Sequence, residues 1–225
     1  NSHKYRVKKL LYLASSCSYP KYCPQPMQAE SLLTGPLEST NEPYAVAKIA
    51  GIKLCQSFHQ QYGDNFICGI PANTFGPGDD FSLENSHVIA ALMRKMHEAK
   101  TQDVKLVEIW GTGTPRREFI FVDDLANACV FILKCYDSAV PINLGSGIDF
   151  SITELAECIK EVVGFQGKLT FDESKPDGMP IKLLDTKELK NMGWKPMWPF
   201  EDALKMTYVW LKKQKTINGG LETEL

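Results

Sequence analysis

The amino-acid sequence predicts an α/β protein built on a mainly parallel sheet, because apolar strand-like runs alternate with helical patterns along the chain. Strands are expected in KKLLYLAS at 8–15, NFICGIPAN at 65–73 and REFIFV at 117–122. Helices are expected from about Pro43, from about Ser86 and over 123–136. Strands and helices in this order form βαβ units, which build the doubly wound, Rossmann-like sheets that bind nucleotides.

Residues with capping preferences mark the expected helix boundaries. Pro43 suits the first positions of a helix, and Asp123 can cap the helix that follows it. Ser151 and Glu154 have the spacing of a capping box. The run WPFEDALKMTYVWLKKQK predicts a final amphipathic helix, and NGGLETEL at 218–225 predicts a frayed tail.

Two Pro- and Gly-rich stretches, NTFGPGDDFS at 73–82 and ESKPDGMP at 173–180, interrupt the strand and helix patterns and predict loops. Open α/β sheets bind ligands at loops that follow their strand ends. We therefore expect both stretches close to a binding site.

Composition narrows the possible functions. The 225 residues are 44% hydrophobic with a formal net charge of -2, so no overall positive field attracts nucleic acid. No apolar run is long enough to span a membrane. Seven cysteines occur without a C-x-x-C pair or the Cys/His spacing of a zinc site. We expect reduced thiols in a cytoplasmic protein, no metal, and at most a small phosphorylated ligand.

A dinucleotide-binding fold is expected to open with a strand and a Gly-rich turn, but no G-x-G-x-x-G opens this sequence. The expectation from this pattern is that the chain begins within the nucleotide-binding domain and lacks its first βαβ segments. Residues 1–225 alone are then expected to be inactive and poorly soluble.

The pair Tyr44 and Lys48 is the strongest local signal for catalysis. The two residues are four positions apart near a helix start, so their side chains lie on one face. A phenol with an ordinary pKa of about 10 transfers protons poorly at neutral pH, and a nearby ammonium favours the phenolate. The alternative is a solvated helix face that carries no function.

Small hydroxyl residues end the first expected strand, about thirty positions before Tyr44. Ser15 or Ser16 can hydrogen-bond a substrate carbonyl, or can simply stabilise a turn. A strand, a serine, a helix-borne Tyr and Lys, and then P-A-N-T-F-G-P resemble the extended short-chain dehydrogenase/reductase family.

Longer strings resemble the GDP-L-fucose synthase family within that superfamily. They are SSCSYPKYCPQPM, ESLLTGPLESTNEPYAVAKIAGIKLC, ENSHVIAALMRKMHEAK, EIWGTGTPRREFIFVDDLA and FDESKPDG, and together they span nearly the whole chain. The resemblance implies epimerisation of GDP-4-keto-6-deoxy-D-mannose at C3 and C5, followed by reduction at C4 by NADPH in the same site. It also implies a homodimer.

The family's motifs assign roles to individual residues. Tyr44 is the implied proton donor, Lys48 its partner, and Ser15 the ketone-binding hydroxyl. Cys17 and His87 match the epimerisation acid/base pair; the alternatives are a buried apolar thiol and a histidine at a helix start. The implied NADP contacts are Leu13, Ala14, Ser15, Ser16, Lys48, Pro71, Ala72, Asn73, Thr74 and His87.

Nucleotide-sugar contacts are implied at Lys95, Trp110, Arg117 and Asp177. An aromatic ring and cations suit a base and a diphosphate. Helical spacing places Arg94 nearer than Lys95 to the face of His87, so the choice between these two stays open, and either can be surface charge.

Two domains are expected, a nucleotide-binding domain of residues 1–75 and 118–145 and a substrate domain of 76–117 and 146–225. Two alternatives to the implied activity remain. The chain can be another nucleotide-sugar epimerase or reductase of the superfamily, against which Cys17 and His87 argue, or an inactive fragment.

Overall fold

The computed structural model describes residues 1–82 and 86–218 and divides them into two compact units. The first unit consists of Asn1–Thr74, Arg117–Asp149 and Ile181–Pro196. The second consists of Phe75–Arg116, Phe150–Pro180 and the segment from Met197 onward. A frayed tail was predicted over 218–225; Asn218 is instead the last residue of a helix, and 219–225 lie outside the described part.

A parallel three-stranded sheet forms the centre of the first unit. Its strands, in the order β1-β2-β6, are Leu10–Leu13, Phe66–Pro71 and Ile142–Leu144. Leu10 pairs with Phe66 and Gly69 with Ile142, and all three strands run the same way. β2 is the middle strand, and its run FICGIP is almost entirely buried, as expected for a parallel strand covered on both faces. The predicted parallel α/β class is confirmed.

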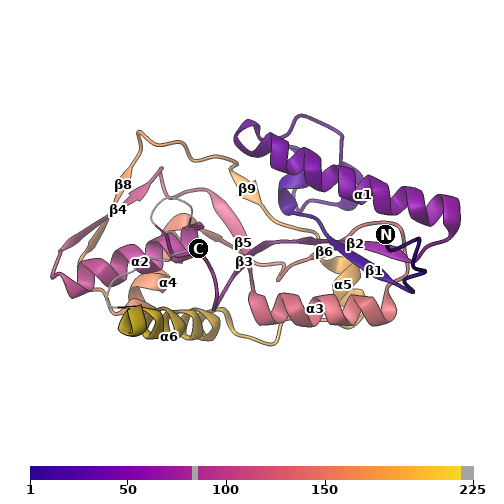
Figure 1. Ribbon diagram of the computed structural model, residues 1–225. Coiled ribbons are helices and arrows are strands. Elements are labelled where there is room, and N and C mark those ends of the chain that lie inside the picture. The colour runs from indigo at the N-terminus through magenta and orange to yellow at the C-terminus, as the bar shows by residue number, and fades with distance from the viewer. Residues whose placement is uncertain (83–85, 219–225) are drawn as a thin grey trace. The chain divides into compact units, whose positions relative to one another are not determined.

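Three helices cover this sheet. Helix α1 (Glu42–Tyr62) lies on one face, and α3 (Val122–Cys135) and α5 (Lys187–Asn191) lie on the other (Figure 1). α1 buries a stripe made of Ala45, Ile49, Ile52 and Cys55. Pro43 stands at its start as predicted, and Gly63 ends it with a φ of 69°, the left-handed conformation that glycine adopts without strain.

The prediction that Asp123 caps a helix is wrong. Phe121 is the N-cap of α3, with φ -68° and ψ 142°, and Asp123 lies in the first helical turn. The reason is that the preceding strand runs directly into the helix, so the last extended residue becomes the cap. Asp123 and Asp124 still interact favourably there with the positive end of the helix dipole.

Helices and a two-stranded sheet form the second unit. Its strands β4 (Leu106–Trp110) and β8 (Lys168–Asp172) are parallel. Helix α4 packs against both α2 and α6 (Figure 1). These helices span Val88–Thr101 (α2), Ile152–Val163 (α4) and Phe200–Asn218 (α6). The predicted capping box of Ser151 and Glu154 opens α4 and is confirmed.

The chain passes between the units within three short strands, β3 (Asn73–Phe75), β5 (Arg116–Phe121) and β7 (Asp149–Ser151), and again directly before β9 (Ile181–Lys182). Three short 3-10 helices complete the elements, at Ser16–Ser18, Ala29–Ser31 and Ser39–Asn41.

The division differs from the sequence-based expectation at four places: Phe75 lies in the second unit, and residues 117, 146–149 and 181–196 lie in the first. Ile181–Pro196 belongs to the first unit, although 146–225 was expected in the second domain. The cause is packing, because Leu184, Leu189 and Trp194 are buried in the hydrophobic core of the first unit. Arg117 also belongs to the first unit, since strand β5 enters that unit one residue earlier than expected.

Candidate active site

Ser15 and Cys17 lie in a tight turn directly after β1. Ser15 is extended and caps the 3-10 helix Ser16–Ser18, with its Oγ accepting a hydrogen bond from the Cys17 backbone N–H at 3.2 Å. Ser16 is buried, whereas Ser15 and Cys17 are half-buried. The turn therefore holds a hydroxyl and a thiol two positions apart at the carboxyl end of a parallel strand, the edge where such sheets bind ligands.

Tyr44 and Lys48 lie beside the same strand end. Lys48 Nζ donates to the Leu13 carbonyl at 3.0 Å, and it lies 5.6 Å from the centroid of the Tyr44 ring. The buried stripe of α1 contains Ala45 and Ile49, so the side chains of Tyr44 and Lys48 lie at the border of the core. Tyr44 is 49% exposed and accessible to a ligand. The first unit thus assembles the predicted Tyr, Lys and Ser around the end of β1.

Two donors converge on Cys17 Sγ that the sequence pattern did not single out. Asn41 Nδ2 lies 3.4 Å from the sulfur, and Lys182 Nζ lies 3.2 Å from it. Asn41 is only three positions before Tyr44, so its place in the same motif could have identified it from the sequence. Lys182 comes 165 positions after Cys17, and no local pattern connects the two.

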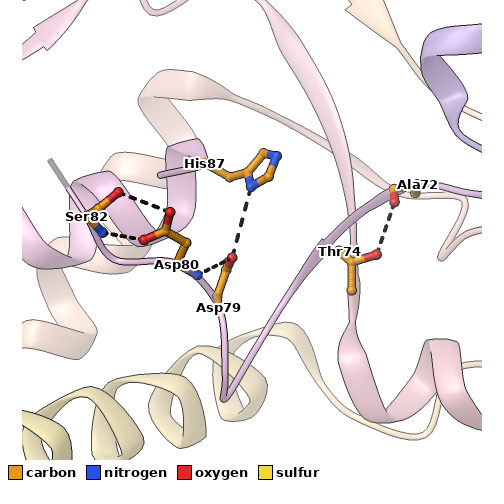
Figure 2. Close-up of polar contacts among 6 residues, drawn as sticks. All are labelled: Ala72, Thr74, Asp79, Asp80, Ser82 and His87. Carbon is orange, nitrogen blue, oxygen red and sulfur yellow. Dashed lines mark hydrogen bonds and ion pairs between the residues drawn. The ribbon is translucent and has the colours of Figure 1, made fainter. Parts of the chain in front are cut away.

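The segment Pro71, Ala72, Asn73 and Thr74 leaves the end of β2 with its polar groups bonded. Ala72 N–H donates to the Leu144 carbonyl at 2.9 Å, and Asn73 Nδ2 donates to the Glu118 carbonyl at 2.9 Å. Thr74 Oγ1 donates to the Ala72 carbonyl at 3.4 Å (Figure 2). The segment is therefore fixed by β6 and β5, which suits a surface that contacts a cofactor.

Arg117 is half-buried on β5 and precedes a carboxyl group that the sequence analysis missed. Glu118 is 1% exposed and accepts hydrogen bonds from the backbone N–H groups of Gly147 at 2.6 Å and Leu184 at 2.8 Å. Burial raises the pKa of Glu118 to about 7, although these donors lower it. A charged residue inside the apolar run REFIFV was the available signal.

In the second unit, His87 is the N-cap residue of α2, and its side chain is 78% exposed. Its Nδ1 lies 4.0 Å from Asp79 Oδ1 (Figure 2). Asp79 also accepts from the Asp80 N–H at 2.9 Å, and burial raises the pKa of Asp79. A carboxylate thus stands next to an accessible imidazole.

Trp110 ends β4 and is 65% exposed. Two lysines flank it, with Lys95 Nζ 5.6 Å and Lys175 Nζ 5.5 Å from a ring centroid. Asp177 accepts from the Thr112 N–H at 2.8 Å and the Thr112 hydroxyl at 2.9 Å, which ties the loop after Trp110 to the loop after β8. An exposed indole with two cations is suited to a nucleobase and phosphates.

Arg94 is placed differently from its neighbour Lys95. Its Nε bonds Glu98 at 2.8 Å, one turn along α2, and its Nη1 donates to the Phe81 carbonyl at 2.7 Å. The side chain is mostly buried, whereas Lys95 lies beside Trp110. The geometry therefore favours Lys95 over Arg94 as a ligand contact.

Residues 1–82 and 86–218 lack two further kinds of feature. No helix in this part is both long and apolar enough to cross a membrane. No three His, Cys, Asp or Glu side chains in the same ranges are grouped so that they could hold a metal ion.

A parallel α/β sheet with a serine at a strand end and a Tyr–Lys pair on a helix is the arrangement expected of the extended short-chain dehydrogenases and reductases. The chain belongs to the NAD dependent epimerase/dehydratase family, whose model matches residues 2–145. It is 54% identical to GDP-L-fucose synthase 1 of Arabidopsis thaliana, over 95% of this chain and 66% of that protein. It is 48% identical to the GDP-L-fucose synthase of Escherichia coli strain K12, over 97% of this chain and 71% of that protein.

A solved structure agrees with these relatives. The fold matches a GDP-L-fucose synthetase from Naegleria fowleri bound to NADP with a TM-score of 0.89 and 30% identity, over 96% of this chain and 69% of that chain. The chain spans 66% of the length of the Arabidopsis relative, slightly less than two thirds.

Proposed function

We propose that this protein contributes the catalytic residues of a GDP-L-fucose synthase. The reaction converts GDP-4-keto-6-deoxy-D-mannose to GDP-L-fucose by epimerisation at C3 and C5 and reduction at C4, with NADPH as the cofactor. One observation carries the proposal: Ser15 and Cys17 lie in the turn after β1, and Lys48, with Tyr44 beside it, is hydrogen-bonded to the end of the same strand. A hydroxyl, a thiol and a Tyr–Lys pair are the groups that this double reaction needs.

The residues of the first unit fit an NADP-type cofactor. Lys48 is fixed on the Leu13 carbonyl with Tyr44 beside it, and the segment 71–74 has its backbone anchored. NADPH, when bound, supplies the hydride for C4. We propose that Lys48 and the segments 13–16 and 71–74 hold it, together with His87.

Epimerisation requires acid/base groups for the carbons beside the ketone. In the proposed step Cys17 acts as a thiolate and takes a proton from such a carbon, so that the C–H bond breaks, an S–H bond forms and the electron pair moves to the ketone oxygen. His87 is the group proposed to return a proton to that carbon. Ser15 stabilises the oxygen by donating a hydrogen bond.

Reduction uses the pair of Tyr44 and Lys48. As C4 is reduced, Tyr44 gives its phenolic proton to the oxygen that becomes a hydroxyl, and the Lys48 ammonium stabilises the remaining phenolate. Trp110 offers a stacking surface for the base, Lys95 and Arg117 supply cations for the diphosphate, and Asp177 completes the substrate contacts.

The proposal includes a cytoplasmic homodimer. All seven cysteines are free thiols, which suits a reducing compartment. α1 exposes Val46 and Leu54, two turns apart on one face, which is apolar surface of the kind that a second copy covers.

Tyr44→Phe tests the proposed reduction in the full-length gene product. The variant keeps the ring and loses the proton, so NADPH oxidation with the ketosugar should fall by a factor of roughly 10² or more. GDP binding should stay unchanged in calorimetry. Tyr62→Phe, at the other end of α1, is the control and should keep the parent rate. A parent rate in Tyr44→Phe contradicts the role of Tyr44.

A further inference from the structure

Cys17 Sγ is held by two nitrogen donors that come from distant segments of the first unit. Asn41 Nδ2 lies 3.4 Å from the sulfur and Lys182 Nζ lies 3.2 Å from it. Both distances are in the range of N–H···S hydrogen bonds. A thiol is a weak acceptor, whereas a thiolate is a strong one, so two donors favour the charged sulfur.

The side chain of Asn41 does not make the hydrogen bond that is usual at its position. Asn41 is the N-cap residue of α1, a position where asparagine is favoured because its side chain can accept from the first free N–H groups. The side chain of Asn41 makes no such capping bond. Its amide nitrogen faces Cys17 instead, and its Oδ1 is buried without a partner among the described residues. The side chain of Asn41 therefore bonds to Cys17 and not to the backbone of the helix.

Lys182 reaches the sulfur from a well-fixed backbone. It belongs to β9, and the two residues that follow are anchored: Leu183 N–H donates to Gln25 Oε1 at 3.0 Å, and Leu184 N–H to Glu118 Oε2 at 2.8 Å. The side chain is half-buried, and in the described part of the chain it forms no ion pair with a carboxylate. Its charge is therefore available to the sulfur.

We propose that Asn41 and Lys182 are positioning residues for proton abstraction, which hold Cys17 Sγ in place and stabilise its thiolate. This inference rests on the proposed function, in which Cys17 is the base. Lys182 is the charged group in contact with the sulfur, while Asn41 and Ser15, which accepts from the Cys17 N–H, are neutral. The arrangement supplies from side chains the electropositive surroundings that a reactive thiol needs.

The first test is the pH profile of Cys17 alkylation by iodoacetamide, read peptide by peptide by mass spectrometry. Lys182→Met should slow the alkylation of Cys17 several-fold near neutral pH, because the sulfur loses its contact with a cation. The exposed Cys135 in the same sample is the internal control, and its profile should not move. Lys187→Met, which removes an exposed lysine from the neighbouring helix, is the matched control variant. Identical Cys17 profiles in the parent and in Lys182→Met overturn the inference.

A second variant separates this role from folding. Asn41→Asp is nearly isosteric and is as good a helix cap, so α1 should keep its stability in thermal unfolding. It places a carboxylate next to Sγ in place of an N–H donor. Solvent deuterium uptake beside the ketone should then fall by about 10-fold or more, and Lys182→Arg should retain most of the uptake. Parent uptake in Asn41→Asp contradicts the role of Asn41.

Cys17→Ala distinguishes the failure of this inference from failure of the proposed function. If Cys17→Ala retains deuterium uptake, Cys17 is not the base and the proposed function fails at that residue. If Cys17→Ala loses uptake while Lys182→Met and Asn41→Asp keep both the parent rate and its pH profile, the proposed function stands and the positioning role is wrong.

Discussion

Glu118 is bonded through both carboxyl oxygens to backbone N–H groups, one in the turn after β6 and one in the segment after β9. The side chain occupies the space that a Cβ on Gly145 would take, so that position requires glycine. Glu118 therefore joins three segments of the first unit. Its neighbour Arg117, a proposed diphosphate contact, is held on the same strand.

The raised pKa of Glu118 makes a pH-dependent contribution to stability. The carboxyl ionises near 4.5 in the unfolded chain and near 7 in the folded one, so the folded state binds more protons between these values. This contribution to the free energy of unfolding is complete below pH 4.5 and is lost as the pH rises through 7.

Glu118→Gln should remove this dependence. Urea unfolding at pH 5.5 and pH 7.5 should show the parent losing stability across the interval, while the variant changes less. The variant should also be less stable at both pH values by about 1–3 kcal/mol, because an amide nitrogen cannot accept one of the two backbone N–H groups. An equal pH dependence in both proteins contradicts the assignment.

At the scale of the element, α1 is brought close to β1 by a glycine. A Cβ on Gly51 would overlap the ring of Tyr12, whose centroid lies 5.6 Å from Lys48 Nζ. The close approach lets Lys48, one turn before Gly51, reach the Leu13 carbonyl. The position of α1 and the hydrogen bond of Lys48 thus depend on the same small residue.

Gly51→Ala is expected to destabilise the protein although alanine is the better helix former. The propensity gain is about 1 kcal/mol and overpacking costs about 1–3 kcal/mol, so a net loss of up to about 2 kcal/mol is expected in chemical denaturation. Ser57→Ala on the exposed face of α1 is the control and should change stability by less than about 0.5 kcal/mol. Equal or greater stability of Gly51→Ala shows that Tyr12 moves away freely.

At the scale of the whole molecule, the chain builds two units from alternating segments. His87, Lys95, Trp110 and Asp177 belong to the second unit, while Ser15, Cys17, Tyr44, Lys48 and Arg117 belong to the first. Each unit has its own core. The proposed roles are distributed in the same way. Tyr44, Lys48 and Cys17 lie in the first unit, and Trp110 with its flanking lysines lies in the second.

The proposed homodimer yields a test on α1. Val46 and Leu54 are 52% and 59% exposed, and Leu54→Glu places a charge on this apolar face. In the full-length gene product the variant should sediment as a monomer under conditions in which the parent is a dimer, because an unpaired charge is costly in an apolar interface. Gln61→Glu near the end of α1 is the control. A dimer that survives Leu54→Glu does not use this face.

The sequence by itself determined the local features of this protein. Alternation of strand and helix patterns predicts the parallel sheet, and Pro43 and the Ser151–Glu154 box mark helix starts correctly. Tyr44 and Lys48 are paired by helical spacing alone. These features depend on neighbours within one or two turns of chain, which are visible in the order of residues.

Only the tertiary structure decided the rest. The partners of Cys17 come from positions 41 and 182, the segment 181–196 joins the first unit through Leu184 and Trp194, and Glu118 bonds amides at 147 and 184. Arg94 is bonded by Phe81 and Glu98, which leaves Lys95 beside Trp110. Such contacts join residues far apart in sequence. They form because burial of apolar surface determines which distant segments pack together, and no local periodicity encodes that packing.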